Sequence, residues 1–162
     1  GQQFEPEQIS SGVPALDTLL GGGLERGTVT VIGGPTGVGK TTTASLFVEE
    51  AARRGERSVM YLFEESKATF IHRTDAIGVG VSEMAANDEL AVEEVEPLNR
   101  SPEEFASLVR AEVEQRDTDV VILDGIKGYT LSIQGEEAAL RRKLHALCRY
   151  LKNVGVTVIL VE

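Results

Sequence analysis

The residues with the clearest chemical meaning lie between positions 34 and 42, where the chain reads GPTGVGKTT. Glycines let successive backbone N–H groups turn toward one anion, and a helix that begins there adds its positive end. The pattern G-x-x-x-x-G-K-[ST] is that of a phosphate-binding loop. We predict that ATP is bound by the following residues: Gly34, Pro35, Thr36, Gly37, Val38, Gly39, Lys40, Thr41 and Thr42.

One side chain of this loop, that of Thr41, and the distant carboxylate of Asp124 form a candidate magnesium site. Lys40 is expected to reach the β- and γ-phosphates, and the Thr41 hydroxyl is expected to bind Mg²⁺. Asp124 follows the apolar run DVVIL at positions 119–123, and an acid at the end of a buried strand is well placed to hold the same ion through water. An aspartate at a strand end is also a common turn or capping residue, so this interpretation depends on the presence of the loop.

A pair of acidic residues, Glu64 and Glu65, ends a second apolar run, SVMYLF at positions 58–63. A carboxylate there can orient or deprotonate the water that attacks the γ-phosphate. Because side chains alternate along a strand, we expect one glutamate to be catalytic and the other to be in a salt bridge. The alternative is a solvated acidic strand end. The candidate catalytic residues are therefore Glu64, Glu65 and Lys40.

The composition weighs against several other classes of protein. The 162 residues carry 16 Lys and Arg against 26 Asp and Glu, a net charge of −10 that disfavours nonspecific nucleic-acid binding. The single cysteine, Cys148, cannot form an internal disulfide, and His72 and His145 are too far apart in sequence for a zinc cluster. A reducing cytoplasm fits this pattern. No apolar run approaches the roughly 20 residues that a membrane span needs.

Apolar strands alternate with amphipathic helices along the chain. The expected strands cover residues 28–32, 58–63, 90–95, 119–123 and 156–161, and the expected helices cover 13–20, 41–54, part of 66–89, a segment from 101 onward, and 136–152. Ser10 or Ser11 is expected to cap the first helix, and strand 28–32 is expected to be buried on both faces. This order predicts an α/β fold with a mostly parallel central sheet, in a single domain covering residues 1–162.

An ordered set of short segments extends beyond the loop. It comprises ISSGVPALD at 9–17, GGG at 21–23, LERG at 24–27, YLFEES at 61–66 and VVILD at 120–124. Together with the phosphate-binding loop, this set resembles the KaiC-like ATPases of the RecA superfamily. The resemblance runs from Ile9 to the last residue. Its specificity comes from the order of the segments, since the loop alone occurs in many nucleotide hydrolases.

The resemblance implies a three-layer RecA-like P-loop core that binds ATP and Mg²⁺. It also implies that Glu64 and Glu65 are the catalytic acidic pair and that Asp124 is the magnesium-associated acid. Such proteins commonly form homo-oligomeric rings, such as hexamers, that bind ATP between subunits. The implied function is ATP hydrolysis that drives or times conformational change in the oligomer. The resemblance is also compatible with a protein partner.

Two features depart from the family pattern. Gly125 follows Asp124 at a point where relatives usually carry Ser or Thr. The sequence stops at Val161-Glu162, where relatives continue with further strands and with Arg or Lys residues that reach a neighbour's nucleotide. We therefore expect a domain without its last strands, an exposed edge on the strand before the loop, and ATP binding with weak hydrolysis.

Three other functions remain compatible with the sequence. An ATP-sensing regulatory module would control a partner through occupancy rather than turnover. A RecA-like DNA-binding recombination ATPase is disfavoured by the net charge, by the 5% aromatic content and by the lack of a basic-aromatic loop suited to single strands. Phosphotransfer to protein Ser or Thr is the third alternative, because some relatives phosphorylate themselves, but no acceptor is identifiable in the sequence.

Overall fold

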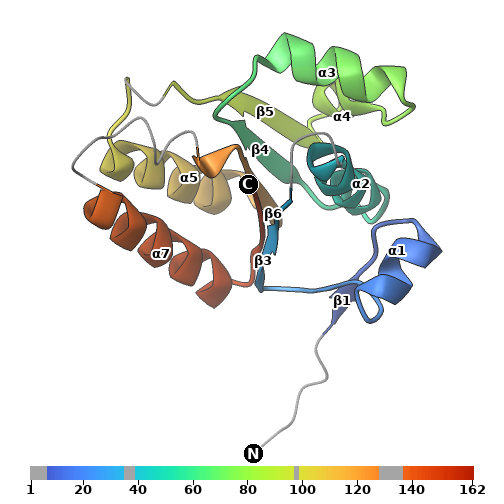
Figure 1. Cartoon of the computed structure of the whole chain (residues 1–162), viewed down its shortest axis with the longest axis horizontal. Coiled ribbons are helices and arrows are strands. Elements are labelled where there is room, and N and C mark those ends of the chain that lie inside the picture. The colour runs from blue at the N-terminus through green and yellow to red at the C-terminus, as the bar shows by residue number, and fades with distance from the viewer. Residues whose placement is uncertain (1–6, 35–38, 97–98, 128–136) are drawn as a thin grey trace, which may run out of the picture.

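A computed structural model describes residues 7–34, 39–96, 99–127 and 137–162. Its centre is a parallel five-stranded sheet between two layers of helices (Figure 1). The strands lie in the order β3-β7-β6-β4-β5, with bounds Val29–Ile32 for β3, Thr157–Val161 for β7, Val120–Asp124 for β6, Ser58–Leu62 for β4 and Leu90–Glu94 for β5. The predicted α/β class, with a three-layer RecA-like core, is confirmed.

The helices divide between the two faces of the sheet (Figure 1). One face carries α2 (Lys40–Arg53), α3 (Lys67–Ala76) and α4 (Val81–Ala86), and the other carries α5 (Pro102–Arg116) and α7 (Glu137–Asn153). Alternation along β4 supplies both cores, because Met60 and Leu62 pack on the α2 side whereas Val59 and Tyr61 pack on the side of α5 and α7. A strand buried in this way has no polar face, which is why it reads as an unbroken apolar run.

Local capping signals explain where two of the helices begin. The Ser101 hydroxyl accepts the backbone N–H of Glu104 at 3.1 Å, and Pro102 takes the first helical position of α5. Helix α3 starts in the same manner, since the Ser66 hydroxyl accepts the backbone N–H of Thr69 at 3.1 Å. The expected helix start at 101 therefore agrees with the structure.

The segment before β3 differs from the expectation at its helix cap. Short strands β1 (Gln8–Ile9) and β2 (Leu24–Glu25) pair antiparallel, with helix α1 (Pro14–Leu19) between them in sequence. The expected cap by Ser10 or Ser11 is wrong, because the residue before the helix is Val13 and no side chain caps it. Both serine hydroxyls donate to Asp17 instead, a charged and therefore stronger acceptor than a neutral group.

The register of the sheet brings the predicted site residues to one edge. Leu62 of β4 lies opposite Asp124 of β6, Asp124 lies opposite Val161 of β7, and Val161 lies opposite Ile32 of β3. The carboxyl ends of these strands lie at the same edge of the sheet because parallel strands run in one direction. The loop after β3, the glutamates after β4 and the carboxylate of Asp124 therefore leave the sheet side by side.

Strand β3 forms one edge of the described sheet. Its only described neighbour is β7, and the exposed fractions of Val29 and Val31 are 36% and 53%. The expectation that this strand is buried on both faces is therefore wrong, while the expected open edge beside the phosphate-binding loop is present. A β-branched apolar run specifies a strand but not its place in the sheet, which is decided by its neighbours. Among the described residues, no helix is long and apolar enough to cross a bilayer.

Candidate phosphate-binding site

A cavity of about 640 Å³ opens at the carboxyl edge of the sheet. The predicted residues of the loop and of α2 that line it are Gly39, Lys40, Thr41 and Thr42. The strand ends contribute Glu64, Glu65 and Asp124, which lie 24, 25 and 84 residues after Lys40 in sequence. Pro35, Thr36, Gly37 and Val38 fall outside the described residues. The cavity therefore brings together the predicted polar groups of the loop end and of two strands.

The start of α2 has the geometry of an anion site. Gly39 precedes the helix with φ +77°, a left-handed conformation that residues with a Cβ rarely adopt. No atom lies within 4 Å of a Cβ built at this position, so the backbone angle rather than space requires the glycine. The glycine offers no side chain to cap the first turn, and the N–H groups there carry the positive end of the helix dipole.

Lys40 spans the ends of the two outer strands on this side. Its Nζ donates to the backbone oxygen of Gly34, after β3, at 2.6 Å and to the backbone oxygen of Glu162, after β7. The side chain is half-buried and lines the cavity. The ammonium is thus held at the carboxyl ends of the strands, where the negative ends of the backbone carbonyls favour it.

Asp124 is the most unusual carboxylate in the cavity. Burial raises its pKa above the usual range, and a hydrogen bond with Thr41 only partly offsets that effect. Its Oδ2 atom is buried and lacks a hydrogen-bond partner among the described residues. An unpartnered buried oxygen costs stability unless a cation or donor joins it. The hydrogen bond with Thr41 brings the two predicted metal ligands, Thr41 and Asp124, into contact.

The two glutamates after β4 have different surroundings. Arg73 donates to Glu65 through both terminal nitrogens, at 2.7 Å from Nη1 to Oε1 and 2.9 Å from Nη2 to Oε2. Glu64 is exposed and forms no ion pair within the described part of the chain. It lies over Gly125, whose hypothetical Cβ would be 2.9 Å from Glu64 Cγ. The salt bridge expected for one of the pair is on Glu65.

Two further residues of the cavity, Thr69 and Arg73, were not among the predicted site residues. Both come from α3 and line the same cavity as Lys40. They are four residues apart in a helix and so share one face. Their spacing directly after the acidic pair could have indicated a shared helix face. The sequence does not show that this face borders the cavity, because that depends on the end of β4 facing α2.

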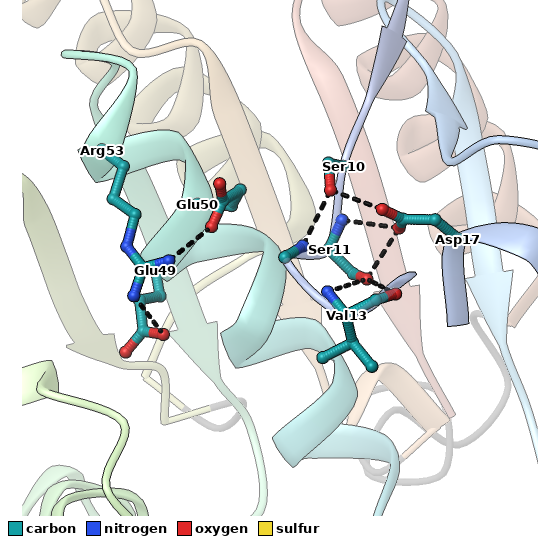
Figure 2. Close-up of polar contacts among 8 residues, drawn as sticks. Ser10, Ser11, Val13, Asp17, Glu49, Glu50 and Arg53 are labelled. Atoms are coloured by element: carbon teal, nitrogen blue, oxygen red, sulfur yellow. Dashed lines mark hydrogen bonds and ion pairs between the residues drawn. The ribbon is translucent and has the colours of Figure 1, made fainter. Parts of the chain in front are cut away.

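A second polar cluster lies at the N-terminal segment (Figure 2). Asp17 accepts from the Ser10 hydroxyl at 2.5 Å, from the Ser11 hydroxyl at 2.7 Å and from the Ser11 backbone N–H at 2.8 Å. The Ser10 bond, followed by the two Ser11 bonds, lowers the pKa of Asp17. The cluster lies beside α2, because a Cβ at Gly12 would be 2.7 Å from Glu50 Oε2. These hydrogen bonds fold the segment onto the core, and no oxygen of the carboxylate is left over.

A cavity of about 750 Å³ lies on the opposite face of the sheet, beside α7. Leu144, Cys148 and Leu160 form its apolar wall, and Arg141 and Lys152 stand among its other lining residues. Burial raises the pKa of the Cys148 thiol, which keeps it neutral. Although larger, this cavity contains none of the predicted site residues.

Comparison with known proteins agrees with the geometry. Residues 9–162 match the family model described as "ATPase: KaiC". The chain belongs to the KaiC ATPase family. Among its KaiC relatives are the circadian clock oscillator protein KaiC of Picosynechococcus sp., 28% identical over 156 residues, and that of Prochlorococcus marinus, 30% identical over 132 residues. These alignments cover 96% and 82% of this chain and 30% and 26% of the relatives. The chain thus spans less than a third of the length of those two KaiC proteins.

Proposed function

We propose that this chain binds ATP with its phosphates over the N-terminus of α2 and hydrolyses it with the help of Mg²⁺. The observation that carries the proposal is the Asp124 carboxylate, which has a buried oxygen without a partner among the described residues and a hydrogen bond with Thr41. The positive end of α2, suited to phosphate, and an acidic group, suited to a cation, lie in one cavity. This pairing supports metal-assisted phosphate chemistry over simple anion binding.

The residues present fit a magnesium ion. Asp124 and the Thr41 hydroxyl supply hard oxygen atoms, which Mg²⁺ prefers. Within the described residues no group of three or more His, Cys, Asp or Glu could hold a metal ion. Nucleotide sites nevertheless use only one or two protein groups, since phosphates and waters complete the shell. When bound, the ion neutralises charge on the phosphate oxygens during transfer.

The remaining side chains have distinct proposed roles. Lys40 binds the outer phosphates, which compete for the ammonium with the Gly34 and Glu162 carbonyls that it contacts in the structure. Glu64 is exposed and lines the cavity, and we assign to it the role of orienting or deprotonating the attacking water. Glu65 lies beside it and is paired with Arg73 in the structure.

The role of the whole protein is a further part of the proposal. The similar proteins are named circadian clock oscillator proteins, and this chain corresponds to about 30% of their length. We propose that ATP turnover at this site drives or times conformational change in a homo-oligomer. The net charge of −10 supports association with protein rather than with nucleic acid.

Calorimetric titration tests the binding step. Lys40→Ala removes one charge-assisted phosphate contact, so we expect the Kd for ATP with Mg²⁺ to rise about 10- to 100-fold. Lys152→Ala is the matched control, because Lys152 is an exposed lysine near the end of α7 on the other face of the sheet. Equal affinity of both variants and the wild type would contradict the proposed site. Thermal melting of each variant separates lost binding from lost folding.

A further inference from the structure

Arg73 is a second cation inside the candidate phosphate site. It lines the same cavity as Lys40, Thr41 and Asp124. Its guanidinium makes a two-pronged ion pair with Glu65, and 44% of the Arg73 side chain and 24% of the Glu65 side chain are exposed. The hydrogen bond with Glu65 raises the pKa of Arg73, and the charge of Asp124 acts in the same direction. Arg73 therefore stays charged and accessible from the cavity.

The described residues that line the cavity include more acidic than basic side chains, which opposes the binding of a triphosphate. Four acidic residues are among the described lining of the cavity, against two cationic ones, Lys40 and Arg73; the acids are Glu64, Glu65, Asp124 and Glu162. In the structure Arg73 is paired with Glu65, whereas Lys40 contacts only backbone oxygens and forms no ion pair with a carboxylate among the described lining residues. A triphosphate brings further negative charge into this surplus. Binding of its outermost group is thus opposed unless Arg73 changes partner.

We propose that Arg73 binds the terminal phosphate of a nucleoside triphosphate in exchange for Glu65. The inference rests on the proposed function and names the residue that distinguishes a triphosphate from a diphosphate. A guanidinium presents the same planar fork to a carboxylate and to a phosphate, so one geometry serves both partners. Exposed ion pairs are weak, so the bond to Glu65 yields readily to a more highly charged anion.

The exchange has a consequence for the glutamate. Once Arg73 contacts the phosphate, the Glu65 carboxylate loses its ion pair and can accept hydrogen bonds from water beside Glu64. A nucleoside diphosphate lacks the group that draws Arg73 away, so the pair with Glu65 persists. Arg73 therefore couples the presence of a third phosphate to the state of the acidic pair. The long side chain makes this a change of rotamer that leaves α3 in place.

Binding constants for two nucleotides test this proposal. The wild-type chain, Arg73→Gln and Arg73→Lys are titrated with Mg²⁺ plus either ADP or a non-hydrolysable ATP analogue. For Arg73→Gln we expect affinity for the analogue to fall about tenfold or more, while affinity for ADP changes by less than about threefold. Arg73→Lys keeps the positive charge but lacks the planar fork of the guanidinium. We expect its affinity for the analogue to lie between those of the wild type and Arg73→Gln. The readout is the ratio of the two affinities, which a merely structural role would leave unchanged.

Arg53→Gln is the matched control. Arg53 also forms an exposed ion pair, with Glu49 and Glu50 (Figure 2). It lies at the far end of α2, about 20 Å along the helix axis from Lys40. We expect its ratio to equal that of the wild type. Equal losses for ADP and analogue in both Arg73 variants would overturn the inference and leave the proposed function standing. A wild-type chain that binds neither nucleotide would overturn the proposed function itself, and this inference with it.

Discussion

Asp17 and Asp124 are both half-buried, and the carboxylate of each is hydrogen-bonded with a hydroxyl. Their surroundings nevertheless shift their pKa values in opposite directions. Asp17 accepts three hydrogen bonds from two serines, which lower its pKa below the usual value of 3.8 (Figure 2). Asp124 bonds with Thr41, and burial raises its pKa above the same value. One oxygen of Asp124 has no partner within the described residues. The first carboxylate is satisfied by the fold, and the second is not.

The difference separates a structural acid from a functional one. Hydrogen bonds that favour the charged form make Asp17 a contributor to stability. Asp124 has a buried oxygen without a partner among the described residues, and such an oxygen lowers the stability of the fold. Such a cost is expected where a ligand supplies the missing interaction. Residue type and position in a motif do not distinguish the two, since both lie in segments that resemble the family pattern.

The largest expected effect is on metal-dependent binding at Asp124. Asp124→Asn keeps the size of the side chain but removes the charge that attracts Mg²⁺. We expect the gain in ATP affinity caused by Mg²⁺ to fall about 10- to 100-fold, with the free energy of unfolding within about 1 kcal/mol of the wild type. Titration with and without Mg²⁺, followed by chemical denaturation, measures both quantities. An unchanged magnesium dependence would end the functional assignment of this carboxylate.

The second effect is on stability at Asp17. Asp17→Asn weakens the bonds to Ser10 and Ser11, and Ser11 is a buried residue. We expect the free energy of unfolding at pH 7 to fall by about 1–2 kcal/mol, with little change in ATP affinity. Denaturation and calorimetry check the two parts. A large loss of ATP affinity at unchanged stability would show that the N-terminal cluster belongs to the site.

Acid titration of the same two variants gives opposite signs. Asp17 has a lowered folded pKa, so its stabilising effect is complete above pH 3.8 and is lost as the pH falls through the folded value. Asp124 has a raised folded pKa, so its cost is absent below pH 3.8 and grows as the pH rises through the folded value. On acidification the wild type should lose stability relative to Asp17→Asn and gain it relative to Asp124→Asn. Equal slopes would contradict the comparison.

The smallest expected effect concerns the glycine after Asp124. Gly125 has φ +85°, and a Cβ there would be 2.9 Å from Glu64 Cγ. Gly155 is a matched control, since its φ is +82° and no atom lies within 4 Å of a Cβ. We expect Gly155→Ala to cost about 1 kcal/mol through backbone strain alone, and Gly125→Ala to cost up to about 1 kcal/mol more. Denaturation of both variants measures the difference, and equal costs would mean that Glu64 moves aside freely.

Local chemistry in the sequence predicted much of the fold. The strand at 58–63 and the helix start at Ser101 appear within about a residue of the expected bounds, because burial on both faces and capping are decided by neighbouring residues. The cap of α1 and the burial of β3 were predicted wrongly. The first depends on the position of Asp17 in space, and the second on which strand lies at the sheet edge.

What the sequence determined by itself is the phosphate-binding pattern, since a glycine with a left-handed backbone angle and a lysine at a helix start are local features of the chain. What only the tertiary structure decided is which distant groups join it. The parallel register places Asp124 beside Thr41, and the packing of α3 places Arg73 on Glu65 rather than on Glu64. Contacts between residues far apart in the chain depend on the packing of whole elements, and local spacing does not contain that information.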